Sequence, residues 1–149
     1  MNRNRLTSIL INTLLFAASI SIIYGYALAF WPIQIVDYHQ AFLATPKDEY
    51  SAGEQLFAHF DLCKKGTYTA TIYPELVGDS IVPMEPFTSQ VAPGCYDTDA
   101  AVGYIPLHTP AGMYKLRLIT RYRVNAFKIV TYSIESTAFS VDESKLIYL

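Results

Sequence analysis

Charged residues are scarce in this chain of 149 residues, where they make up 16% against 52% for hydrophobic residues. An average soluble domain is about one quarter charged, so part of the chain is not ordinary soluble surface. The formal net charge of -2 excludes nucleic-acid binding driven by bulk positive charge. Eight prolines and the lack of a sustained heptad repeat exclude a coiled coil. With 12 tyrosines and 8 phenylalanines, the chain is too aromatic to be disordered.

Motifs of catalytic and metal sites are also missing. The sequence contains no G-x-S-x-G, no phosphate-binding loop, no G-x-G-x-x-G and no H-E-x-x-H. The histidines His39, His59 and His108 stand singly, and Asp97 and Asp99 lack the rest of a calcium-binding loop. We therefore expect no catalytic residue, no bound metal and no cofactor.

A long uncharged segment lies near the N-terminus. Positions 6–36 are 31 consecutive residues without a charge, whereas about 20 apolar residues suffice to span a bilayer as a helix. Tyr24, Tyr26 and Trp31 gather at the far end of this segment, where amphipathic rings favour the membrane interface. The pattern predicts one transmembrane helix over residues 6–31.

The flanking charges predict the orientation of this helix. Arg3 and Arg5 both precede the apolar segment, and basic residues favour the cytoplasmic side of a membrane. We therefore expect residues 1–5 in the cytoplasm and residues 32–149 outside it, with the chain in the inner (plasma) membrane and in contact with its lipids.

The same segment can also be read as a cleaved signal sequence. Ala27-Leu28-Ala29 matches the A-x-A pattern of signal peptidase sites, and cleavage after Ala29 would release a soluble secreted domain. The apolar core of a signal peptide usually runs about 7 to 15 residues, while Leu6–Ile23 already has 18. The length favours the retained anchor, and cleavage remains the alternative.

Small side chains recur every fourth residue in this segment, at Ala17, Ser21, Gly25 and Ala29. Such a stripe lets two membrane helices approach closely, so it is a candidate surface for helix–helix association. The other interpretation is that small residues are simply common in membrane spans.

The remainder of the chain has the patterns of an all-β domain. Its apolar residues alternate with polar ones at a period of two, and proline and glycine punctuate it at short intervals. About seven strands in about 110 residues suit an immunoglobulin-like β-sandwich. The expected strands are 33–42, 55–62, 67–73, 101–107, 114–124 and 129–136, with 80–90 as a loop or edge strand and with Phe139 and Val141 closing the sheet.

The two strands 114–124 and 129–136 should form a hairpin of defined register. A loop over Asn125-Ala126-Phe127 pairs Tyr122 with Val130, Leu118 with Ile134 and Arg117 with Glu135. A two-residue loop would instead place arginines opposite core residues. Because a slip of one residue turns every side chain to the other face, we predict the first register or another of the same parity.

Cys63 and Cys95 are the only two cysteines and lie 32 positions apart, both in the outer domain. An even number of cysteines in an oxidising compartment predicts one disulfide. Two separate free thiols are the alternative.

Basic residues concentrate on one face of the strand 114–124. Lys115, Arg117, Arg121 and Arg123 share odd numbering, so alternation places them together on one face of the sheet. They form a candidate binding face for an acidic partner, for lipid headgroups or for a polyanion. The simpler interpretation, which we favour, is a solvated sheet face paired with carboxylates of neighbouring strands.

Several short motifs resemble those of a known group of proteins. The run from Thr109 to Leu116 contains P-A-G-x-Y-x-L, and Tyr50-Ser51-Ala52-Gly53-Glu54 precedes an early strand. Both look like segments of immunoglobulin-like and fibronectin-like domains. Together with the N-terminal span, the spaced cysteines and Arg121-Tyr122-Arg123-Val124-Asn125, the layout resembles small membrane proteins encoded in tailed-phage genomes. That resemblance implies an immunoglobulin-like outer domain and no particular activity.

These observations favour a non-enzymatic, membrane-anchored envelope protein that presents a β-sandwich for protein binding or assembly. It is expected to act in a host envelope or in a virion, and its protein partner is not identified by the sequence. A secreted binding subunit released after Ala29 is the first alternative. A small hydrolase or metal enzyme on a β-scaffold is the second, and it requires a pocket that gathers His39, His59 or His108 with carboxylates.

Overall fold

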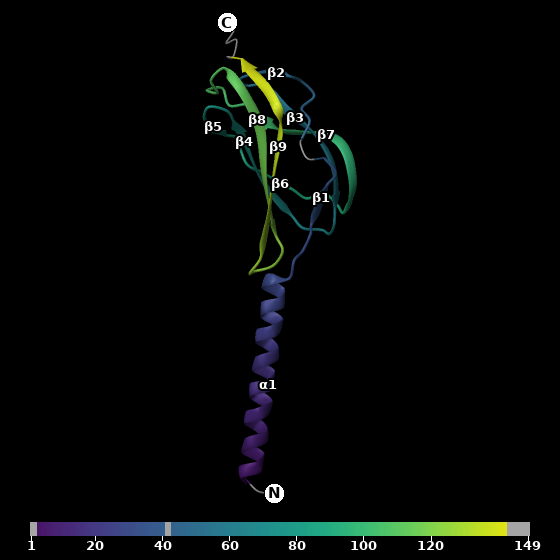
Figure 1. The fold of residues 1–149 in the computed structure, drawn as a ribbon, viewed down its shortest axis with the longest axis vertical. Helices are drawn as coiled ribbons and strands as arrows, with labels where there is room; N and C mark the ends of the chain where they lie inside the picture. Colours follow the sequence, from purple (N-terminus) through teal and green to yellow (C-terminus); the bar gives the residue numbers. More distant parts are fainter. Residues whose placement is uncertain (1–2, 41–42, 143–149) are drawn as a thin grey trace. The chain divides into compact units, whose positions relative to one another are not determined.

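The computed structural model describes residues 3–40 and 43–142, and it divides into two compact units. The helical unit extends to Ile33, contains the N-terminal helix α1 (Arg3–Phe30) and includes residues 125–128. The β unit begins at Gln34 and contains every strand of the described chain (Figure 1). The prediction of a mostly β chain with one N-terminal apolar helix is therefore confirmed.

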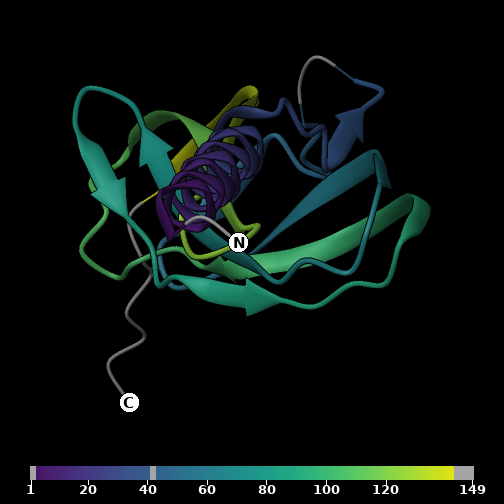
Figure 2. The same cartoon turned by 90° about the horizontal axis from the view of Figure 1, so that it is seen from below.

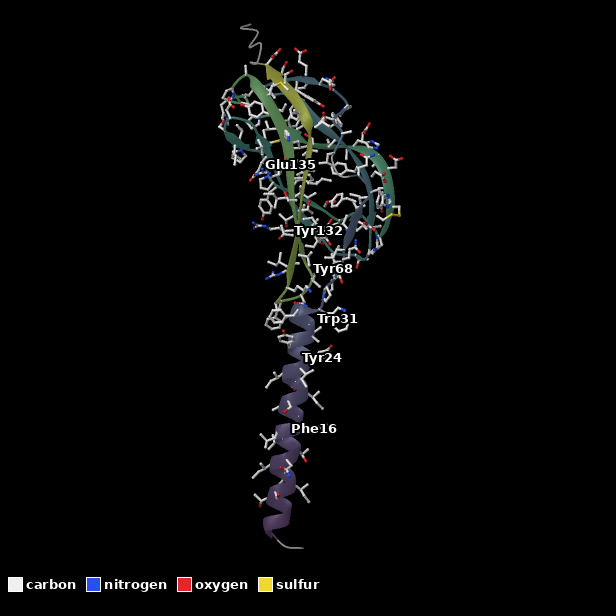
Figure 3. The ribbon with its side chains drawn as sticks, in the orientation of Figure 1. Phe16, Tyr24, Trp31, Tyr68, Tyr132 and Glu135 are labelled. Atoms are coloured by element: carbon white, nitrogen blue, oxygen red, sulfur yellow. A yellow bond between two sulfur atoms is a disulfide. The ribbon has the colours of Figure 1, made fainter. Side chains whose placement is uncertain are left out.

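From Thr7 onward, helix α1 is uncharged and mainly apolar. Its segment Thr7–Phe30 has 24 residues, which extend about 36 Å at the rise of an α-helix. The hydroxyls of Thr13, Ser19 and Ser21 each donate to the carbonyl four residues earlier, at 2.9 Å, so these polar groups are satisfied within the helix. The side chains project outward along its length (Figure 3). The helix is long and apolar enough to cross a membrane, a property that it shares with signal sequences.

Polar groups satisfy the C-terminal end of α1. The Trp31 N–H donates to the Ala27 carbonyl at 2.9 Å and so continues the last turn. Within the same unit, the Asn125 amide donates to the Leu28 carbonyl at 3.3 Å, and the Lys128 ammonium donates to the Trp31 carbonyl. A cation at this end of a helix also complements the helix dipole.

The β unit contains two sheets. The small sheet has the order β1-β3-β7, and the large sheet has the order β2-β9-β8-β4-β5, with β6 also paired to β4. All pairs are antiparallel except β2 with β9. The strands of both sheets curl strongly (Figure 2). Their bounds are β1 (Val36–Tyr38), β2 (Glu49–Ser51), β3 (Gln55–Lys64), β4 (Ala70–Val77), β5 (Ile81–Pro83), β6 (Phe87–Ser89), β7 (Gly94–Tyr104), β8 (Gly112–Arg123) and β9 (Ile129–Asp142).

The hairpin of β8 and β9 has the predicted register. Tyr122 pairs with Val130, and Leu118 pairs with Ile134. In the loop, the Phe127 N–H donates to the Asn125 side-chain oxygen at 2.9 Å, which is the local turn that asparagine favours. The alternation of β8 therefore sets its even-numbered residues inward and its basic residues outward, as predicted.

Both sheets contribute to one hydrophobic core. Leu56 and Ala58 come from β3, Leu116 and Leu118 come from β8, and all four are buried. At one end of the core, the rings of Tyr50 and Phe139 meet edge to face, with centroids 5.2 Å apart. Other buried members are Leu43, Ala52, Leu76, Val82, Met84, Val102, Ile105, Tyr114, Ile134 and Val141.

The strands differ in extent from several of the sequence predictions. The strand expected at 101–107 begins at Gly94 and ends at Tyr104, because β7 pairs along nearly the whole of β3. The strand expected at 67–73 is shifted to Ala70–Val77 and includes Pro74. Proline is tolerated there because β6 pairs with residues 70–72 and β5 pairs with residues 75–77. Pro74 lies between these two ladders, so neither strand needs the N–H that proline lacks.

Smaller differences concern the first and last strands. Of the expected strand at 33–42, only Val36–Tyr38 pairs, and residues 41–42 lie outside the described residues. The short strand Glu49–Ser51 was not predicted. Phe139 and Val141 do extend the large sheet, as the C-terminal part of β9 rather than as a separate strand.

Replacement of Leu116 by alanine tests the central position of β8. Leu116 is fully buried, and deletion of such a side chain costs roughly 2–5 kcal/mol of unfolding free energy. We expect this loss in urea unfolding of the full chain in lipid nanodiscs, followed by the near-UV circular dichroism of its tyrosines. Met113→Ala on the same strand is the control, since Met113 is 62% exposed. Equal midpoints for the two variants would contradict this packing.

Candidate functional site

The disulfide predicted between Cys63 and Cys95 is present, with a Cα–Cα distance of 4.0 Å. It joins β3 to β7 at directly opposed positions. Both cysteines of the chain are thereby used, and no thiol remains as a nucleophile. The alternative of two free thiols is wrong for this structure.

Histidines and aspartates gather on the outer face of the small sheet. His39 Nδ1 lies 2.8 Å from Asp61 Oδ1. His59 Nδ1 lies 2.9 Å from Asp99 Oδ1, and its Nε2 lies 3.0 Å from Asp97 Oδ1. We refer to these five residues as the histidine–aspartate face. The hydrogen bond to Asp99, together with the charge of Asp97, raises the pKa of His59.

This face does not form the pocket that an enzyme hypothesis requires. The Asp97 side chain is 79% exposed and that of His39 is 47% exposed. His108 lies apart, in the exposed turn between β7 and β8. Among residues 3–40 and 43–142, no group of three or more histidine, cysteine or acidic side chains is placed to hold a metal ion. Two of the three histidines thus meet carboxylates on an open surface rather than in a cavity.

The four basic residues of β8 share one outer face of the large sheet, as predicted, and one of them is paired with carboxylates. Arg117 lies 2.8 Å from Glu135 and 3.8 Å from Glu75, on the two neighbouring strands. The guanidinium of Arg121 stacks over the Tyr73 ring at 4.9 Å. The remaining members, Lys115 and Arg123, are exposed. This pattern favours an ordinary solvated sheet face.

The stripe of small residues lies open along α1. Ala17, Ser21 and Gly25 are exposed and Ala29 is half-buried. A Cβ added to Gly25 would meet nothing within 4 Å. The surface is therefore available to a second helix, and helix–helix association stays a prediction.

A cavity of about 170 Å³ lies between the two sheets and is partly open to solvent, since Thr98 and Ala100 in its wall are exposed. Its walls are mainly apolar and come from β1, β3, β4, β6, β7 and β8. The small residues Ala70, Ala100 and Ala101 are among those that line it, and their size leaves the space unfilled. The other lining residues are Tyr38, Phe60, Leu62, Lys64, Ile72, Phe87, Ser89, Val91, Tyr96, Thr98, Leu118, Thr120 and Tyr122.

Lys64 is the one basic residue among those that line the cavity. It is 6% exposed, and its ammonium donates to the Val91 carbonyl at 2.6 Å. It also lies 5.8 Å from the centroid of the Tyr122 ring. Burial lowers the pKa of Lys64 and raises the pKa values of the phenols of Tyr38 and Tyr122, because a buried site disfavours the charged form of each group.

Sequence reasoning missed Lys64, although the signal was present. The inward-facing row of β3 begins with Leu56 and Ala58 and continues through Phe60 and Leu62. One further step of two residues places Lys64 on the same inward face. Lysine is rarely buried, so an inward position is unexpected for this residue type.

The contacts of His59 predict a pH dependence of stability. A raised pKa in the folded state means that folding favours the protonated imidazole. The stabilisation is fully present below the ordinary value of about 6.5 and is lost as the pH rises through the raised pKa. Three carboxylates face this ring, Asp97 and Asp99 from β7 and Asp61 from β3.

We therefore expect His59→Gln to lower the thermal midpoint of the full chain more at about pH 5.5 than at about pH 9. Titration of the His59 ring by NMR should give a pKa above about 6.5. His108→Gln is the control, because His108 lies outside the histidine–aspartate face. A His59→Gln effect that is equal at both pH values would contradict the assignment.

Comparison with known proteins gives little that bears on this chain. No protein-family model matches it, and no curated protein matches it either. Among solved structures, it is similar to the sporulation control protein Spo0M from Bacillus subtilis, with a TM-score of 0.39 and 14% sequence identity. That match covers 75% of this chain and 51% of Spo0M, so the chain spans about half the length of that protein. Similarity at this level carries no argument about function.

Proposed function

We propose that this chain is a non-enzymatic, membrane-anchored envelope protein that presents an immunoglobulin-like β-sandwich outside the cytoplasm and binds a protein partner there. The length and apolar surface of α1 support the anchor. Two sheets that share one core support the sandwich. The resemblance to phage-encoded single-span proteins supports a site of action in a host envelope or in a virion.

The observation that carries the binding proposal is the open edge of β7. This strand has 11 residues and pairs with β3 on one side. In the described part of the chain, no strand pairs with its other side. A long edge strand of this kind is a template for strand addition by another protein.

The disulfide identifies which backbone groups face that edge. Cys63 and Cys95 are directly opposed with their Cα atoms 4.0 Å apart, which marks a pair without mutual backbone hydrogen bonds. Such pairs alternate with hydrogen-bonded pairs along the ladder. Asp97 and Asp99, two and four residues after Cys95, therefore also belong to pairs without mutual backbone hydrogen bonds. Consistent with this, the N–H of His59, opposite Asp99, points away from β7 and donates to Ala44. The N–H groups of Asp97 and Asp99 therefore face the open edge.

The charges beside this edge indicate the chemistry of the partner. The side chains of Asp97 and Asp99 are 79% and 58% exposed on the outer face. Carboxylates on an edge strand discourage unspecific pairing, and opposite charges on directly neighbouring strands attract. The partner that fits is an extended segment with lysine or arginine at alternate positions.

Membrane attachment is tested by expressing the full chain with a C-terminal tag. We expect it to stay in membranes washed with alkaline carbonate and to keep its N-terminus, because a mainly apolar helix of 24 residues is long enough to span a bilayer. The tag should be accessible to protease from the extracytoplasmic side only. A soluble product that begins at Phe30 would overturn the anchor and support the secreted alternative.

Strand addition is tested with Asp97→Pro against Asp97→Ala. Both variants lose the contact with His59, but only proline removes the N–H that faces the edge. A photo-crosslinker at exposed Tyr104, the last residue of β7, should first identify the partner segment in native membranes. The corresponding peptide should then bind Asp97→Ala, and binding to Asp97→Pro should be at least about tenfold weaker, since a backbone hydrogen bond is lost and the added ring obstructs pairing.

Hydrogen exchange supplies an independent measurement of the same proposal. The amides of Asp97 and Asp99 should become protected when the peptide binds, and the circular dichroism of both variants should show an intact fold. Equal affinity of the peptide for the proline and alanine variants would refute strand addition at β7.

A further inference from the structure

We propose that the cavity between the sheets binds a carboxylate that carries one apolar group, with the Lys64 ammonium as its counter-ion. This site is distinct from the edge of β7, and it stands whether or not strand addition occurs there.

The position of Lys64 is fixed by the strand that carries it. It is the last residue of β3 and belongs to the same inward row as Leu62, so its side chain enters the interior between the sheets. At 6% exposed it is among the few buried polar residues of the β unit. A lysine at the end of a strand can usually extend into solvent, whereas the Lys64 side chain turns into the interior.

Among residues 7–40 and 43–142, no carboxylate lies within ion-pair distance of the Lys64 ammonium. Of its three N–H donors, one is used on the Val91 carbonyl, and the Tyr122 ring lies nearby. An anion that enters the pocket would pair with this ammonium beside mainly apolar walls, where opposite charges attract more strongly than in bulk water.

The size of the cavity limits what the anion can carry. Its volume of about 170 Å³ is close to that of an engineered cavity of about 150 Å³ that takes up benzene. Phe60, Leu62, Ile72 and Leu118 supply apolar walls. One aromatic ring or one branched aliphatic group therefore fits the space.

The number of charges selects the head group. One ammonium compensates one negative charge, and a dianionic phosphate would leave a second charge buried and unpaired. A carboxylate separated from the apolar group by a few bonds meets both requirements within one small cavity. The same chemistry occurs in small free acids and in the C-terminal residue of a protein that ends in an apolar side chain.

The test uses the full chain in lipid nanodiscs and measures binding by calorimetry. Phenylpropionate is the probe, and phenylpropanol, which has the same ring and no charge, is the matched ligand control. We expect the acid to bind and the alcohol to bind at least tenfold more weakly. Lys64→Met should weaken binding of the acid at least tenfold, whereas Lys115→Met, which removes an exposed lysine of β8, should leave it unchanged.

A second variant tests the cavity without altering the charge. Ala100→Leu fills the space between the sheets and should abolish binding of phenylpropionate while Lys64 remains in place. Thermal unfolding and an intact Cys63–Cys95 disulfide verify the fold of each variant. Lys64→Met should stay folded, since replacing a buried charge by an apolar side chain of similar length is often neutral or stabilising.

Peptides distinguish the two sources of the ligand. A tetrapeptide that ends in phenylalanine and its C-terminal amide are compared with the free acid. Tighter binding by the peptide acid assigns a protein C-terminus, and tighter binding by phenylpropionate assigns a small molecule. The proposal is overturned if neither acid binds, if acid and alcohol bind equally, or if folded Lys64→Met binds the acid as the natural chain does.

Discussion

The alternation of side chains along β3 is the constraint on which the placement of the candidate functional groups depends. Its odd positions put His59, Asp61 and Cys63 on the outer face of the small sheet, and its even positions put Leu56 and Lys64 inside. The disulfide holds β7 in register against this strand. A shift of one residue would bring the aspartates inside and move Lys64 into solvent. The outer face, the cavity and the open edge therefore follow from one register.

Local patterns predicted those parts of the structure that local physics decides. The apolar run predicted α1. The alternation in residues 114–136 predicted the register of β8 and β9, including the pair Leu118 and Ile134. The parity argument also placed Arg117 beside Glu135. Each of these features is fixed by residues close together in sequence, so no distant contact had to be known.

The parts that could not be predicted depend on distant contacts. Residues 94–101 contain Gly94, two aspartates and two alanines, which have low strand propensity. They form a strand because β3, more than 30 residues earlier, supplies the ladder and the disulfide. Lys64 lies inside because it belongs to the inward-facing row of β3. The orientation of that row is set by Leu56, eight residues earlier. Such conflicts between local preference and position often mark functional or strained sites.

The pocket between the sheets leaves apolar surface of the β unit uncovered. Phe60, Ile72 and Leu118 line it together with Ala100, which is exposed, so this surface is accessible to a ligand. Leucine in place of Ala100 would cover part of it without altering a strand.

Strand β7 belongs to both proposed sites, and this links them physically. Its even residues Thr98 and Ala100 line the cavity, while the N–H groups of its odd residues Asp97 and Asp99 face the open edge. A ligand in the cavity would contact the inner side of this strand, and a partner strand would bond to the edge of the same backbone. If one event changes the affinity of the other, linkage requires the change to be equal in both directions.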